Sequence, residues 1–76
     1  MVTHAMVHKA NQIALFFAAY PHDEAVAGVA DHLKKFWEPR MKRQIIAYVE
    51  SGGAGLHELV PDAVRRLEAE MQAARG

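Results

Sequence analysis

Histidine offers the greatest scope for chemistry in this sequence, because imidazole binds metal ions and changes its charge near neutral pH. Five His residues are present, and His4 and His8 are four positions apart. On a helix this spacing brings both rings within reach of one metal ion. No third His or carboxylate follows on that segment, so a distant ligand would have to complete a site. We assign no metal ligand and expect two exposed side chains near the terminus, with metal binding as the alternative.

Candidates for catalysis by a nucleophile or by an acid–base pair are nearly absent. The sequence has no Cys, and Ser51 is its only Ser, which leaves almost no basis for Ser or Cys nucleophilic catalysis. The carboxylates of Asp31, Glu38 and Glu50 are explained more simply as helix-surface or helix-end charges. The Gly-rich segment 52–55 lacks the Lys-Ser/Thr ending of a phosphate-binding loop. We therefore predict no catalytic or cofactor-binding residue, and a protein that is not by itself an enzyme.

Length and charge restrict the class of protein further. A chain of 76 residues can form one domain, and a domain of this size buries only about 60% of the surface that its unfolded chain exposes. Nine basic residues balance nine acidic ones, so the chain as a whole is not attracted to nucleic acid or to an anionic membrane. The longest apolar run, Ile13 to Tyr20, is far shorter than the roughly 20 residues of a membrane span. Without a recognisable leader sequence, we expect a cytoplasmic protein.

Helical periodicity extends along the chain, and no segment alternates as a strand would. We expect helices over about 3–19, 22–37, 39–50 and 58–74, with Pro residues at or just before the opening turns. The segment 51–55, Ser-Gly-Gly-Ala-Gly, indicates a loop. The predicted fold class is all-α: a small single domain over residues 1–76, formed by a bundle of four helices with a Pro-marked corner between helices two and three.

Three of these helices have one apolar stripe opposite a polar face, which is typical of helices that pack on a core. The stripes are Val26, Val29, Ala30, Leu33, Phe36 and Trp37 in the second helix, Met41, Ile45, Tyr48 and Val49 in the third, and Val60, Val64, Leu67 and Met71 in the fourth.

The first helix differs because it is apolar on almost every side. Its core stripe is Met6, Ala10, Ile13 and Phe17, and a second apolar surface surrounds Asn11 and consists of Val7, Ala14, Leu15 and Ala18. A helix that is apolar all round is normally buried all round. Three other helices are too few to cover it, so we predict that part of it binds another protein. The alternative is that the other helices and the Gly-rich loop cover it.

Two polar or small positions contribute to the predicted interface. Asn11 either bonds a partner's backbone and fixes the register of the contact, or it caps a local carbonyl or faces water. Gly28 costs about 0.5–1 kcal/mol relative to Ala within a helix, which close approach by a partner would explain, although simple tolerance is the alternative. The complete predicted partner interface is Val7, Asn11, Leu15, Ala18, Gly28, Trp37 and Arg40.

A cluster of cations, the basic rim, surrounds the corner and consists of Lys34, Lys35, Arg40, Lys42 and Arg43. Such a cluster binds phosphate, nucleic acid or an acidic protein surface, or it is simply solvated. Paired helices at a tight corner also occur in helix-turn-helix proteins, so a small nucleic-acid-binding protein using residues 34–43 is the alternative function. It is the less favoured one, because Gln44 is nearly the only side chain there that could read base edges.

Two segments of the chain resemble the delta subunit of soluble NAD-dependent (molybdenum/tungsten) formate dehydrogenases. The first is Lys9-Ala10-Asn11-Gln12-Ile13 followed by Phe16-Phe17, and the second is His32-Leu33-x-x-Phe36-Trp37-Glu38-Pro39-Arg40-Met41. The resemblance extends from about His4 to Leu67. Lys9 stands where the family pattern has Met, and residues 68–76 do not match.

The resemblance implies a role in a cytoplasmic complex that oxidises formate to carbon dioxide and reduces NAD. In that family the large catalytic subunit holds a molybdenum or tungsten pterin dinucleotide and iron–sulfur clusters, and other subunits hold FMN, further clusters and the NAD site. For this chain the resemblance implies no cofactor and an accessory role in assembly, cofactor insertion or stability of the large subunit, its expected partner. For the chain isolated from its partner, the alternative is a homodimer that forms through the same surface.

Overall fold

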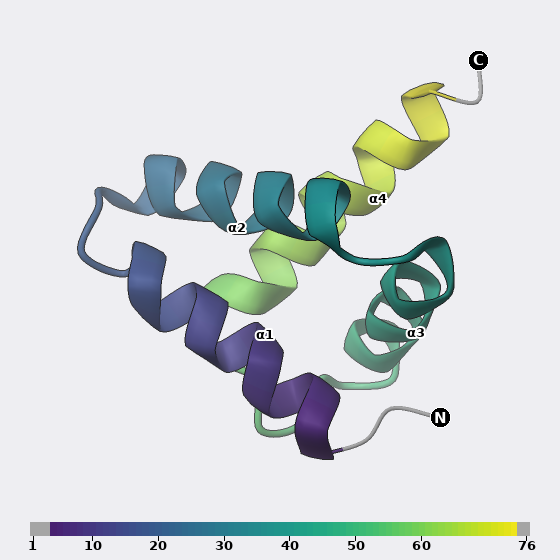
Figure 1. Ribbon diagram of the computed structural model, residues 1–76, viewed down its shortest axis with the longest axis horizontal. Coiled ribbons are helices and arrows are strands. Elements are labelled where there is room, and N and C mark those ends of the chain that lie inside the picture. Colours follow the sequence, from purple (N-terminus) through teal and green to yellow (C-terminus); the bar gives the residue numbers. More distant parts are fainter. Residues whose placement is uncertain (1–3, 75–76) are drawn as a thin grey trace.

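The computed structural model describes residues 4–74, which form four α-helices and no strand. In chain order these are α1 (His4–Phe17), α2 (His22–Phe36), α3 (Pro39–Glu50) and α4 (Leu59–Ala74) (Figure 1). α2 lies across α4. α1 and α2 are close at the turn that connects them and spread apart from it, and α3 lies near the C-terminal end of α2. The predicted all-α fold of four helices is confirmed. None of these helices has both the length and the apolar character needed to span a membrane.

Proline residues set several helix boundaries. α3 begins at Pro39 and ends at Glu50, as predicted, because Pro suits the first helical position and its preceding residue stays extended (Glu38 φ −66°, ψ 153°). α1 ends at Phe17, two residues earlier than expected. The chain turns there, just before Pro21, and the N–H of Tyr20 donates to the carbonyl of Phe17 (3.0 Å). α2 and α4 each differ from expectation by one residue, and the expected start at residue 3 lies outside the described residues.

The core lies mainly between α2 and α4, which make the most extensive helix contact. Its largest fully buried side chains are Leu33, Ile45, Leu67, Val29, Val60 and Val64. The apolar stripes of α2 and α4 therefore face one another largely as predicted. In α3 only Ile45 is fully buried, and Met41, Tyr48 and Val49 are partly buried against the core.

Phe36 is an exception, since 71% of it is exposed, so its predicted place in the core was wrong. Figure 1 shows the reason: α1 and α2 are close at their connecting turn and move apart toward the C-terminal end of α2. Phe36 is the last residue of α2, where α1 has already diverged. The neighbouring Trp37 points inward instead and is only 9% exposed.

The close crossing of α1 and α2 depends on Gly28. A Cβ atom at this position would lie 2.5 Å from two ring carbons of Phe17, closer than van der Waals contact permits. The close approach that we attributed to a partner at Gly28 therefore comes from Phe17 of the same chain.

Gly28→Ala is expected to destabilise the fold by about 1 kcal/mol, because an overpacking cost of roughly 1–3 kcal/mol exceeds the helix-propensity gain of up to about 1 kcal/mol. Denaturant titrations of Gly28→Ala, Phe17→Ala and the double variant measure the coupling. Since truncation of Phe17 removes the clash, the double variant should be more stable than the sum of the two single effects. Strict additivity would contradict this account of the helix crossing.

Candidate partner-binding surface

The outer side of α1 carries two large apolar side chains that the rest of the chain leaves exposed. Leu15 is 62% exposed and Phe16 is 70% exposed. On the side of α1 that faces the core, Met6, Ala10 and Ala14 are buried, and Ile13 and Phe17 are partly buried against the core. α1 is therefore fully covered on this side, whereas Leu15 and Phe16 are left open.

The structure divides the predicted second apolar surface of α1 into a covered part and an open part. Ala14 is buried, so it belongs to the core rather than to this surface. Val7 and Asn11 are partly buried, while Leu15 and Ala18 are exposed. The Gly-rich loop covers part of this surface, which was the alternative to a partner. Gly55 lies so close to Val7 that a Cβ atom added to it would be 3.9 Å from a methyl carbon of Val7, an ordinary van der Waals contact.

Asn11 attaches this loop to α1 through both ends of its amide. Its Nδ2 donates to the carbonyl of Gly55 (2.9 Å), and its Oδ1 accepts from the backbone N–H of His57 (2.7 Å). The hydroxyl of Tyr48 donates to the carbonyl of Ala54, so the loop is also held from α3. Asn11 therefore makes its bonds within the chain. The sequence predicted a partner's backbone, a local carbonyl or water as the bonding group, whereas the bonding groups belong to Gly55 and His57, more than forty residues away in the same chain.

Asn11→Leu is expected to lower the free energy of unfolding by about 1–2 kcal/mol, because two hydrogen bonds are lost and each is worth about 0.5–1.5 kcal/mol, with water replacing part of the loss. Hydrogen exchange of the His57 amide should accelerate more than that of amides in α2. Equal changes in both places would show that the bonds do not hold the loop specifically.

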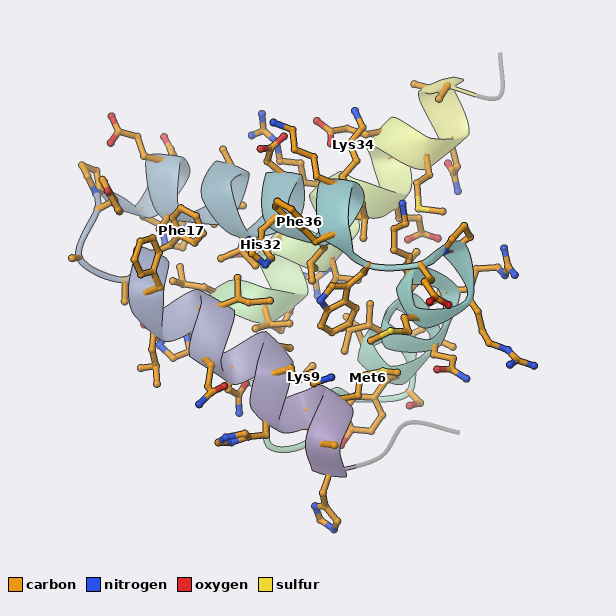
Figure 2. The ribbon with its side chains drawn as sticks, viewed as in Figure 1. Met6, Lys9, Phe17, His32, Lys34 and Phe36 are labelled. Atoms are coloured by element: carbon orange, nitrogen blue, oxygen red, sulfur yellow. The ribbon has the colours of Figure 1, made fainter. Side chains whose placement is uncertain are left out.

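An aromatic hollow lies between the outer side of α1 and the C-terminal half of α2. Its volume is about 340 Å³, and it is lined by Gln12, Ile13, Phe16, Phe17 and His32. The ring centroids of Phe16 and Phe17 are 5.1 Å apart in an edge-to-face arrangement, and those of His32 and Phe36 are 4.7 Å apart. In Figure 2, His32 and Phe36 extend from α2 on the side of α1, and Phe17 lies where the two helices meet. Phe16 therefore lines the hollow directly, and Phe36 adjoins it through its contact with the ring of His32.

Some cations of the basic rim are engaged within the chain. The Nζ atom of Lys35 lies 3.1 Å from a carboxylate oxygen of Asp31. The Nζ atom of Lys42 donates to the carbonyl of Lys34 (3.0 Å), at the C-terminal end of α2, where the helix dipole favours a cation. Arg43 lines a second hollow, between α3 and α4, together with Glu50 and Glu68. Only part of the rim is therefore available to a partner.

Trp37 and Arg40, also assigned to the interface, lie at the corner. Trp37 is buried in the core, whereas Arg40 is exposed. Trp37 can therefore support a binding surface by fixing the corner, and Arg40 is accessible for direct contact.

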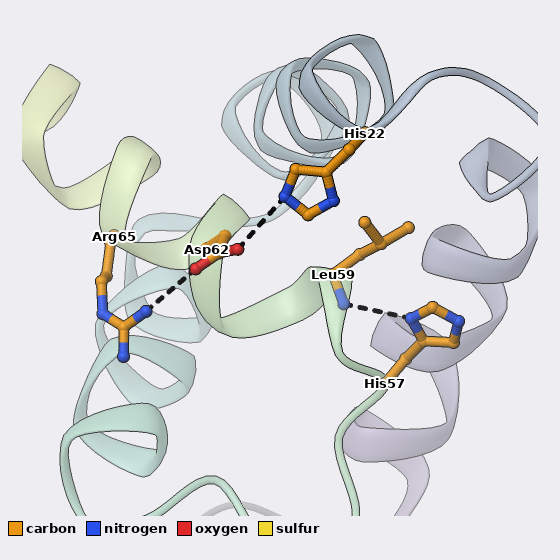
Figure 3. A network of polar contacts seen from close by, with 5 residues as sticks. All are labelled: His22, His57, Leu59, Asp62 and Arg65. Atoms are coloured by element: carbon orange, nitrogen blue, oxygen red, sulfur yellow. Dashed lines mark hydrogen bonds and ion pairs between the residues drawn. The ribbon is translucent and has the colours of Figure 1, made fainter.

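His4 and His8 are one turn apart on α1 and both are exposed, as expected. His22 is 3.4 Å from Asp62, which also pairs with Arg65 at 3.0 Å, and the Nδ1 of His57 accepts from the N–H of Leu59 (Figure 3). The Arg65–Asp62 ion pair is exposed and contributes at most about 1 kcal/mol. Within residues 4–74, no three His, Cys, Asp or Glu side chains are grouped so that they could hold a metal ion.

The fold and its surface define a small helical protein whose most distinctive feature is an uncovered apolar helix side. Residues 5–64 match the family of NADH-dependent formate dehydrogenase delta subunits (FdsD), and the chain belongs to this family. The resemblance inferred from the two sequence segments is thereby confirmed. Searches of curated proteins and of solved structures gave no match.

Proposed function

We propose that this chain is a non-catalytic accessory subunit of a cytoplasmic NAD-dependent formate dehydrogenase complex, and that it docks on the large catalytic subunit. The observation that carries the proposal is the uncovered apolar side of α1, with Leu15 and Phe16 exposed, on a chain of the delta-subunit family. Large exposed apolar side chains that adjoin one another are typical of protein interaction sites.

The redox cofactors implied by the family belong, in this proposal, to the other subunits. A molybdenum or tungsten pterin dinucleotide, iron–sulfur clusters, FMN and NAD would all be held by partner proteins. This chain does not suit iron–sulfur clusters, because it has no Cys to provide thiolate ligands. Its proposed contribution is to the assembly, cofactor insertion or stability of the large subunit.

The mode of docking follows from which helix sides are covered. Apart from Phe36, the apolar stripes of α2 and α4 are largely buried against each other, so these two helices offer little other apolar surface to a partner. α1 offers Leu15, Phe16 and Ala18 on its outer side. A partner that covers this side would remove from water the apolar area that the three other helices leave exposed.

The test is purification of the formate dehydrogenase by a tag on its large subunit, from cells with and without this chain. We expect this chain to co-purify in fixed stoichiometry. Without it, the enzyme should contain less molybdenum or tungsten if the role is cofactor insertion, or fewer assembled subunits if the role is structural support. Absence of the chain from the purified enzyme, with unchanged metal content and assembly in the deletion strain, would contradict the proposal.

A further inference from the structure

We propose that the aromatic hollow between α1 and α2 binds an acidic segment of the partner, which inserts an apolar side chain beside Phe16 and Phe36 and places a carboxylate near Lys9. This inference rests on the proposed function, since the segment belongs to the formate dehydrogenase complex. It adds the binding site on this chain and the chemistry of the segment that occupies it.

The apolar part of the argument is the exposure of two phenylalanines at the hollow: Phe16 lines it, and Phe36 contacts His32, which also lines it. Phe16 and Phe36 come from different helices and are 70% and 71% exposed. Ile13 and Phe17 form the apolar wall of the hollow between them. Aromatic side chains around a pocket are the usual anchors of protein interfaces. The hollow therefore suits one inserted apolar side chain.

The charge of this surface favours an acidic occupant. Lys9 is the only Lys or Arg in α1, and α1 contains no Asp or Glu. None of the residues that line the hollow is acidic, and the nearby carboxylate of Asp31 is already paired with Lys35. Gln12 and His32 add N–H groups that can donate to a carboxylate. The hollow is thus lined by two side chains that can donate and by no carboxylate, and Lys9 adds one cation on the same side of α1 as Phe16.

Helix geometry determines how far apart the apolar side chain and the carboxylate of the partner segment should be. Lys9 and Phe16 are seven residues apart in α1, nearly two full turns, so they lie on the same side of the helix, about 10 Å apart along its axis. Figure 2 shows Lys9 on the N-terminal half of α1, beyond the aromatic side chains of the hollow. The partner segment should therefore present a carboxylate about 10 Å from its apolar anchor.

The same charge pattern argues against a second copy of this chain as the occupant. In a symmetric dimer the surface would contact itself. Lys9 would then approach a copy of the same surface, in which α1 has no acidic residue to pair with it. A partner of opposite charge satisfies the surface, and a second copy does not.

The experiment titrates the purified chain into formate dehydrogenase isolated from cells that lack it. Phe16→Ser, Phe36→Ser and Lys9→Glu should each weaken binding by about tenfold or more, as expected for anchors of an interface. Lys9→Arg should bind within about twofold of the original chain, because it keeps the charge. Arg66→Glu is the matched charge control, since Arg66 is exposed on α4, does not line the hollow and is not part of the basic rim. Circular dichroism checks that each variant remains helical.

Two different failures can be told apart. If the original chain binds, and Phe16→Ser and Lys9→Glu bind equally well, the inference about the hollow is wrong and the proposed function stands. If the original chain does not bind at all, both the inference about the hollow and the proposed function are wrong. A photo-crosslinking phenylalanine analogue at position 36 identifies the occupant directly: the captured peptide should contain Asp or Glu near an apolar residue, and a basic peptide would overturn the inference.

Discussion

Trp37→Ala is expected to lower the free energy of unfolding by about 3–5 kcal/mol, the usual cost of truncating a buried aromatic side chain. Trp37 is buried where α2 ends and the chain turns into α3. A domain of this length has a total stability of roughly 4–11 kcal/mol, so the variant should be largely unfolded or have a greatly lowered midpoint. Thermal and urea unfolding followed by circular dichroism measures the effect.

The adjacent residue provides a matched control for Trp37. Phe36 is also aromatic but is mostly exposed, so Phe36→Ala should change stability by only about 0.5 kcal/mol. Trp37→Phe should retain most of the stability. Equal destabilisation by Trp37→Ala and Phe36→Ala would contradict the inward and outward placement of these neighbours.

Leu15→Asp is expected to weaken binding to the large subunit by about 2 kcal/mol or more, roughly 30-fold, if Leu15 is a buried anchor in the complex. The free chain should remain folded, because Leu15 is mostly exposed and the new carboxylate stays in water. Co-purification with the tagged large subunit, with a titration of the purified proteins, measures the loss.

A matched control for Leu15→Asp is Ala69→Asp, which adds the same charge at an exposed position of α4. It should leave binding within about twofold of the original chain, since an isolated surface charge away from an interface has little effect. Undiminished co-purification of Leu15→Asp would remove Leu15 from the interface.

Local signals in the sequence predicted most of the fold. Pro39 determines the start of α3 through its own φ angle and its effect on Glu38, so that boundary needed no tertiary information. The stripes of α2 and α4 follow from helical periodicity alone. These features depend on neighbours in the sequence, which is why they agree with the structure.

Two residues whose surroundings were predicted wrongly, Phe36 and Gly28, depend on how the helices cross. Phe36 lies on the apolar side of α2 by periodicity, yet it is exposed because α1 diverges from α2 before reaching it. Gly28 is explained by the ring of Phe17, a contact that spacing within α2 does not reveal. Both outcomes depend on an interhelical geometry that a single sequence does not specify.

The candidate site was anticipated in part. The all-round apolar character of α1 indicated an uncovered side, and Leu15, one of the predicted interface residues, is exposed, whereas the equally exposed Phe16 was not among them. The Asn11 bonds join positions that are more than forty residues apart, so the alternatives for Asn11 could not be separated by local pattern. The aromatic hollow was missed because it requires Phe16 and His32 to come together from different helices.

The most direct test of the docking account is the structure of the assembled formate dehydrogenase determined by electron cryo-microscopy. We predict that Leu15 and Phe16 lie in contact with the large subunit. A map in which the outer side of α1 faces solvent, while another part of this chain forms the interface, would contradict it.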